Sequence, residues 1–215
     1  MDDKALKIGV IAELEWEPSV DADDIGVTVE DGIVRLFGHV PNYAQRLAAE
    51  GAVKRIKGVR GYVDDIEIRP FVETYTDEGV AERAANVIGW DVSLPKDKVK
   101  VKVSKGYVTL TGEVDWEYQR QSAELGVKRL LGVRGVTNLI TLKPHVRAGD
   151  VKHRIEQALE RQAELEASNI QVTVDGATVR LNGKVKAFHE RGIAERAAWA
   201  APGVLAVEDH MTISF

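Results

Sequence analysis

Alternating apolar and polar residues mark two neighbouring strands near the start of the chain. Apolar side chains occupy every second position through residues 25–29 and again through residues 34–40, and Asp31-Gly32 lies between the two runs. Strict alternation is typical of a strand with one buried face, and Asp-Gly between two such runs indicates a two-residue hairpin turn. We therefore expect these two strands to pair antiparallel.

Helical spacing flanks this hairpin on both sides. Apolar residues recur at intervals of three and four through residues 6–14 and, after the hairpin, through residues 49–56. Gly58 then predicts the end of the second helix, as a left-handed cap would. A third strand ends at Ile68. The order predicted for this unit is helix, strand, strand, helix, strand.

The same pattern occurs three times. Segments that begin at Ile25, Val99 and Ile170 align without a gap, and all three carry the same residue type at eleven positions. Six glycines belong to this shared set: Gly38, Gly112 and Gly183 in the second strand, and Gly58, Gly132 and Gly203 after the second helix. An internal period of this kind predicts repeated units of one fold.

We therefore predict an α+β protein of three tandem modules, 1–69, 75–143 and 148–215. A strand-helix-strand crossover is right-handed and makes its two strands parallel, so each sheet should be three-stranded and mixed, with both helices on one face. The short junctions 69–72 and 143–146 both contain proline and should be stiff. Asp77 and Asp150 stand where N-caps of the first helices are expected.

Some shared positions predict packing roles. Gly38 and its two counterparts lie in phase with the apolar face of the second strand, where a missing side chain lets a helix approach closely. In the third copy the turn glycine moves to Gly176, and Ala200-Ala201-Pro202 replaces the residues at the end of the second helix. We expect that helix to be shorter or less well packed than its counterparts.

Polar residues and tryptophans also recur. Arg46 and Glu50, four apart on the second helix, predict a surface ion pair, with a charge site for a partner as the alternative. A backbone-capping role is expected for the aligned residues of the third strand: Asp64, Asn138 and Asp209. Trp16 and Trp90 occupy equivalent positions near the end of the first helix, which predicts that they fill equivalent gaps in the core.

The second copy carries a basic strand that the others lack. Lys98, Lys100 and Lys102 alternate with valines and so share one face, whereas the first copy has Asp24, Gly26 and Thr28 there and the third has Asn169, Gln171 and Thr173. One interpretation is an edge strand that lysines protect from pairing with other sheets. The other is a patch for anionic lipid headgroups or phosphate.

Aromatic residues collect after the second strand, and in the second copy they are Trp116 and Tyr118. Such residues suit a membrane interface or a protein partner, and they suit packing against a neighbouring module equally well. Together with Lys98, Lys100 and Lys102, they are the candidate surface for an anion or a lipid.

Composition excludes several classes of function. The 215 residues include 29 basic and 34 acidic side chains, a net charge of −5, which does not describe a general nucleic-acid binder. Without cysteine there is no disulfide, thiolate metal site or cysteine nucleophile. The five histidines are scattered, and no nucleotide-binding, hydrolase or metalloprotease motif occurs. We expect no catalytic residue, metal or cofactor.

The ends of the sequence and its apolar runs bear on location. The acidic, amphipathic start lacks the basic region and apolar core of a secretory signal, so we expect a cytoplasmic protein, or a periplasmic one if a leader was removed. The longest apolar run, residues 197–207, is far shorter than the roughly 20 residues that span a bilayer. No transmembrane segment is expected, and the oligomeric state stays open.

At these residues the chain resembles a known family, the BON domain. The family pattern of a V-x-V strand, a turn glycine, V-x-L-x-G-x-V, an alanine-rich helix and a closing strand matches VTVEDGIVRLFGHV and GVRGYVDDI in the first copy. The second copy matches through VKVSKGYVTLTGEV and the third through VTVDGATVRLNGKV. Three such modules cover nearly the whole chain.

The resemblance implies a non-catalytic binding protein. Members of the family are associated with phospholipid surfaces, protein partners and osmotic or envelope stress, and one relative binds potassium. We therefore expect contact with a phospholipid surface or a protein partner in a stress response. A monovalent-cation sensor and a structural adaptor are the alternatives that the residues leave open.

Overall fold

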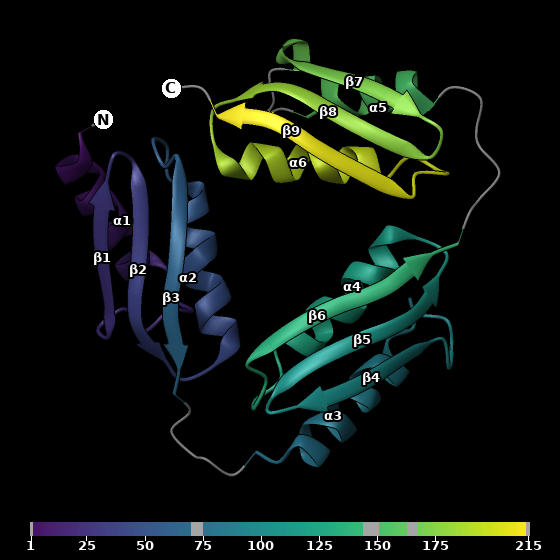
Figure 1. The fold of residues 1–215 in the computed structure, drawn as a ribbon, viewed down its shortest axis with the longest axis horizontal. Coiled ribbons are helices and arrows are strands. Elements are labelled where there is room, and N and C mark those ends of the chain that lie inside the picture. The colour runs from purple at the N-terminus through teal and green to yellow at the C-terminus, as the bar shows by residue number, and fades with distance from the viewer. Residues whose placement is uncertain (1, 70–74, 144–150, 163–166, 214–215) are drawn as a thin grey trace. The chain divides into compact units, whose positions relative to one another are not determined.

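The computed structural model describes residues 2–69, 75–143, 151–162 and 167–213. Most of each proline-containing junction and the predicted cap Asp150 lie outside the described residues. The three modules repeat one arrangement of helices and strands (Figure 1).

Module 1, the N-terminal module, has two helices and three strands. In chain order they are α1 Asp3–Trp16, β1 Ile25–Glu30, β2 Ile33–Val40, α2 Tyr43–Arg55 and β3 Gly61–Ile68. β2 is the central strand, with β1 antiparallel on one side and β3 parallel on the other. Leu6, Val10 and Leu14 of α1 are buried, as their spacing predicts.

Modules 2 and 3 repeat this topology. Module 2 consists of α3 Asp77–Trp90, β4 Val99–Ser104, β5 Tyr107–Val114, α4 Glu117–Lys128 and β6 Gly135–Leu142. Module 3 consists of α5 Val151–Glu160, a 3-10 turn at Ala167–Asn169, β7 Ile170–Asp175, β8 Thr178–Val185, α6 Phe188–Trp199 and β9 Ala206–Ile213. The predicted fold class, three α+β modules with mixed three-stranded sheets, is confirmed.

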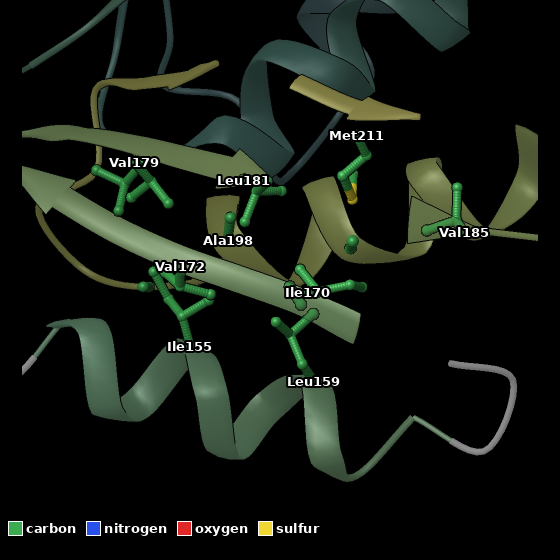
Figure 2. Packing of buried hydrophobic residues seen from close by; sticks show 13 residues of the cluster. Ile155, Leu159, Ile170, Val172, Val179, Leu181, Val185, Ala198 and Met211 are labelled. Carbon is green, nitrogen blue, oxygen red and sulfur yellow. The ribbon is translucent and has the colours of Figure 1, made fainter. Parts of the chain in front are cut away.

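Each module has its own apolar core between one sheet face and the two helices. In module 3, Ile155 and Leu159 of α5 point towards the sheet, where Val172, Leu181 and Met211 are buried (Figure 2). Burying such a side chain contributes about 1.5–3 kcal/mol relative to leaving it exposed. Because the core lies on one side only, the opposite face of each sheet is left to solvent within its module.

The strand glycines that the three modules share were predicted to admit a close helix, and they have a different role. Gly38, Gly112 and Gly183 take φ values of +114°, +141° and +135°. A Cβ atom at each would lie 2.0 Å from a carbonyl oxygen just before the first strand, that of Asp24 in module 1 and Lys98 in module 2. The prediction of a close helix was wrong, because the close neighbour is the backbone of the adjacent strand.

The glycines after the second helix lie in a turn and not at the helix cap. α2 ends at Arg55, and Gly58 follows three residues later with φ +99°. In module 2, Val133 N–H donates to the carbonyl of Leu130 across the same turn. A Cβ on Gly132 would lie 2.6 Å from Cβ of Tyr75, so the position is also sterically closed.

One other local prediction was wrong. Thr76, not Asp77, caps α3, and its hydroxyl accepts from Gly79 N–H. Asp77 instead accepts from Lys105 N–H and Gly106 N–H at 2.7 and 2.8 Å and so ties the helix to the hairpin turn. α6 has 12 residues, the same number as α4 and one fewer than α2, so the expected shortening is one residue at most.

Candidate functional site

The three lysines of module 2 lie on an edge strand. Lys100 and Lys102 belong to β4, which pairs only with β5 among the described residues, and Lys98 directly precedes it. All three are exposed, while the alternating valines of β4 are half-buried towards the helices. The predicted alternation is therefore confirmed, and the lysines lie on the sheet face away from the core.

We call this surface the open face of module 2. It consists of the side chains that alternate away from the helices on β4, β5 and β6, together with Lys98: Lys98, Lys100, Lys102, Tyr107, Thr109, Thr111, Glu113, Thr137, Leu139 and Thr141. The antiparallel register of β4 and β5 places Lys102 beside Thr109 and Lys100 beside Thr111. The face is flat, mostly hydroxylated and basic along one edge.

The lysines of this face form no ion pair. Within the part of the chain that the structure describes, no ion pair involves Lys98, Lys100 or Lys102. Glu113 is the single acidic side chain of the face, which leaves the face with three positive charges against one negative charge. The positive charge along this edge therefore exceeds the negative charge on the face.

The corresponding faces of the other modules are internally paired. On module 1, Arg35 contacts Asp65 at 3.0 Å, and His39 lies 3.5 Å from Asp24. These pairs join adjacent strands, and with Glu67 on the same face the acidic side chains outnumber the basic ones.

On module 3 two carboxylates contact Arg180, whereas the exposed Lys184 forms no ion pair among the described residues. Glu208 lies 2.6 Å from Arg180 and 3.6 Å from His210, and Asp175 lies 3.6 Å from Arg180. The hydrogen bond between Arg180 and Glu208 and their opposite charges raise the pKa of Arg180 and lower the pKa of Glu208. The same backbone therefore carries a paired arginine and one unpaired lysine in module 3, and three unpaired lysines in module 2.

The structure does not place the predicted aromatic residues on the open face. Trp116 and Tyr118 are 40% and 58% exposed, but they lie at the start of α4, in the helix layer on the other side of the sheet. The lysines and these aromatic residues therefore do not form one flat surface.

Trp16 and Trp90 are not core residues, so that prediction was wrong. They are 84% and 77% exposed. The residue after Trp90, Asp91, turns inwards and accepts from the hydroxyls of Ser93 and Ser122 at 2.6 and 2.5 Å. These hydrogen bonds lower the pKa of Asp91. The hydrogen bonds fix Asp91 in the turn after α3, while Trp90 at the end of the helix and the fully exposed Val92 point to solvent.

This projecting loop was missed in the sequence although a signal was present. Trp16-Glu17-Pro18-Ser19 and Trp90-Asp91-Val92-Ser93 share a Trp-acid-x-Ser pattern. Glu17 accepts from the Ser19 hydroxyl at 2.7 Å, as Asp91 does from its serine. An acidic residue tied to the serine two positions later turns the chain and leaves the tryptophan outside the core.

The predicted ion pair of the second helix has a different partner. Arg46 Nε lies 2.7 Å from Asp64 Oδ2, and Arg191 contacts Asp209 at 2.6 Å. Partial burial disfavours ionisation of Arg46, but the hydrogen bond that Arg46 donates to Asp64, together with the negative charges of Asp64 and Glu50, outweighs it and raises the pKa of Arg46. The capping prediction for the third strand is confirmed, since Asp64 Oδ1 accepts from Ile66 N–H at 3.0 Å.

We call these polar residues between the second helix and the third strand the helix–strand cluster. In module 2 an amide, Asn138, replaces the aspartate of the other two modules. Asn138 Oδ1 accepts from Ile140 N–H, and its amide donates to Glu124 at 2.9 Å. Burial alone would raise the pKa of Glu124, but the hydrogen bonds from Lys128 and Asn138 lower it. In module 3 the corresponding Glu195 has a raised pKa, because it is partly buried and lies against the carboxylate of Asp209.

Neither a metal site nor a membrane-spanning helix occurs among the described residues. No group of three or more histidine, aspartate or glutamate side chains could hold a metal ion in those residues. None of the helices that the structure describes is long and apolar enough to cross a bilayer.

Comparison with known proteins identifies the family. The BON domain model matches residues 2–70, 76–144 and 148–214, and the chain therefore belongs to the BON domain family. Osmotically-inducible protein Y of Escherichia coli (strain K12) is 34% identical over 152 residues, which cover 66% of this chain and 74% of that protein.

Solved structures give a much weaker likeness. The C-terminal domain of CdsD, a structural protein of the type III secretion system of Chlamydia trachomatis, is 15% identical over the full length of both chains, with a TM-score of 0.27. A second structure of CdsD gives a TM-score of 0.26 at the same identity, over 98% of this chain and 92% of that one. Scores this low support no inference about function.

Proposed function

We propose that this protein is a non-catalytic binding protein that contacts anionic phospholipid headgroups through the open face of module 2. The observation that carries the proposal is the contrast between the modules. Arg35 in module 1 and Arg180 in module 3 are each paired with a carboxylate on this face, whereas Lys98, Lys100 and Lys102 form no ion pair among the described residues. The fold does not require lysine there, so the charge is available to an external anion.

The energetics favour a surface that carries many phosphates. Each lysine near an anionic membrane contributes about 1 kcal/mol, so three contribute about 3 kcal/mol, or roughly a 150-fold change in affinity. Alternate residues of a strand lie about 6.6 Å apart. Three charges at that spacing can contact separate headgroups, and salt should weaken the contact because all three are exposed.

The segment Trp90-Asp91-Val92-Ser93, which we call the Trp90 loop, supports a location of the protein at a membrane surface. Tryptophan favours the boundary between water and hydrocarbon because its ring is apolar and its indole N–H is polar. Trp90 and Val92 project from a loop fixed by Asp91, and Lys96 and Lys98 follow within a few residues. Exposed apolar groups next to uncompensated lysines suit a membrane surface.

The similarity to an osmotically inducible protein supports a role in osmotic stress. We infer that this chain acts when osmotic conditions change, at a membrane surface and without catalysis. The ionisable side chains of the open face lie along a flat strand and do not converge in a cleft, so they suit adhesion better than acid–base chemistry.

The test is a vesicle-binding measurement with a charge-matched control. The variant K98Q/K100Q/K102Q should bind vesicles of phosphatidylcholine and phosphatidylglycerol about 100-fold more weakly than the wild type. The control K4Q/K7Q/K57Q removes the same charge at exposed positions of module 1 and should retain most of the affinity. Equal loss in both variants, or equal binding to vesicles of phosphatidylcholine alone, would contradict the proposal.

A further inference from the structure

The outer edge of β6 differs from those of the other third strands. No strand pairs with this edge among the described residues. β6, Gly135–Leu142, contains no charged residue over its eight positions, and Leu139 at its centre is 57% exposed. The corresponding strands carry polar ionisable side chains at the same place, Asp65 in β3 and His210 in β9. Charged side chains are the usual protection of an exposed edge, and β6 lacks them.

The backbone of β6 can accept a further strand. Lys143 N–H donates to the carbonyl of Val114 on β5, and alternate residues of a strand direct their backbone groups to opposite sides. Asn138 and Ile140 therefore direct theirs outwards. Ile140 N–H now donates to Asn138 Oδ1 at 3.2 Å and would donate instead to a carbonyl of the added strand. The Asn138 amide would keep its bonds to Arg120 and Glu124.

The side chains of β6 match a second copy of the same strand. A two-fold axis through Leu139 pairs Leu139 with its own copy, and Thr137 with Thr141 of the second copy on each side. Threonine pairs and apolar pairs directly across an antiparallel ladder are favourable, whereas like charges are unfavourable. The same operation on β3 would place Asp65 against Asp65. On β9 it would place His210 against His210 and Glu208 against Thr212, so β6 is the third strand whose outward pairs are all uncharged.

We propose that two copies of this chain associate through antiparallel pairing of their β6 strands. The two-fold axis joins two three-stranded sheets into one of six strands in the order β4-β5-β6-β6-β5-β4. The contact is isologous, as most homodimer interfaces are. Both open faces then point to the same side, with the two lysine strands about 24 Å apart at the outer edges of the sheet.

This dimer has a consequence for membrane contact, which rests on the proposed function. Two lysine strands on one face would bind an anionic surface as one bivalent unit, which raises the overall affinity without any new contact. The dimer itself does not depend on lipid and is tested without it.

Sedimentation equilibrium of the full chain over a range of protein concentrations tests the proposal. The wild type should show a reversible monomer–dimer equilibrium. L139D, which installs the residue that module 1 has there, should be monomeric over the same range, and H210D, the same change in module 3, should behave as the wild type. Leu139 is exposed, so circular dichroism should show L139D folded. A monomeric wild type, or equal association of L139D and the wild type, would overturn the proposal.

Amide hydrogen exchange gives a second readout in the unmodified protein. Exchange at Val136 and Asn138 should slow as the dimer forms, while exchange at the equivalent Val207 and Asp209 of module 3 should not change. Slowing at both strands, or at neither, would count against β6 as the interface. A monomeric protein that still binds anionic vesicles would remove the dimer and leave the proposed function intact.

Discussion

Modules 2 and 3 place different side chains on the same backbone. Their strands pair in the same register, and Gly112 and Gly183 adopt the same left-handed conformation. On the open face, however, the exposed lysines of β4 correspond to neutral polar residues in β7, and Leu139 corresponds to His210. The comparison separates positions that the fold needs from positions that are free to carry function.

The buried positions account for this shared backbone. Val108 and Leu110 in module 2 are fully buried, as are Val179 and Leu181 at the same places in module 3. A one-residue change of register would turn these side chains to solvent, so the core fixes the pairing. The open face makes no comparable demand, and its side chains can therefore differ between the modules.

The largest expected effect comes from the strand glycine, which both modules share. Gly112→Ala should destabilise module 2, and Gly183→Ala module 3, each by about 3 kcal/mol. An alanine at either position would combine a forbidden φ with a Cβ only 2.0 Å from a backbone carbonyl oxygen. Urea unfolding followed by circular dichroism measures the loss.

Gly192 provides the control for this substitution. It lies within α6, and its nearest neighbour beyond the local backbone is the flexible end of Arg196 at 3.4 Å. Gly192→Ala should stabilise the helix by up to about 1 kcal/mol. Equal effects of the three alanines would show that the strand glycines have no special role.

The next effect tests whether open-face charge is interchangeable. Q171K/T173K should give module 3 a lysine strand like that of module 2. At about 1 kcal/mol per lysine, affinity for vesicles that contain phosphatidylglycerol should rise roughly 30-fold. Stability should hardly change, because both positions are exposed in β7. Unchanged affinity would mean that binding needs a feature specific to module 2, such as the Trp90 loop.

The smallest effect concerns pH and the helix–strand cluster. The raised pKa of Glu195 gives module 3 stability that is present below the ordinary carboxyl pKa and is lost as the pH rises through the folded value. The lowered pKa of Glu124 does the opposite, and gives module 2 stability that is lost as the pH falls through its folded value. Acidification should therefore weaken module 2 relative to module 3.

Exchanging the third-strand residue of the cluster, Asn138 or Asp209, should reverse the direction in which the pKa of the neighbouring glutamate is shifted. Asp209→Asn removes the second carboxylate and should lower the pKa of Glu195, whereas Asn138→Asp should raise the pKa of Glu124. Side-chain NMR titration of the two glutamates measures both shifts. If Asp209→Asn leaves the pKa of Glu195 unchanged, burial alone causes the shift.

The comparison of sequence with structure follows the same division. The alternation at residues 34–40 predicted the central strand, and three repeats predicted three modules. Trp16 and Trp90 were wrongly placed in the core, because a repeated apolar residue near a helix end has the same pattern whether the chain turns inwards or outwards there. The partner of Arg46 was also wrong, since helical spacing reveals neighbours on one helix but not the strand residue that packs beneath it.

The sequence by itself determined the repeat, the fold class, the buried face of each strand and the lysine row, because these depend on short-range periodicity. Only the tertiary structure decided that the lysines lack acidic partners while Arg35 and Arg180 have them, that the strand glycines face a carbonyl oxygen, and that Trp90 projects from a fixed loop. These features depend on which residues of distant segments meet, and one-dimensional spacing does not encode distances across a sheet.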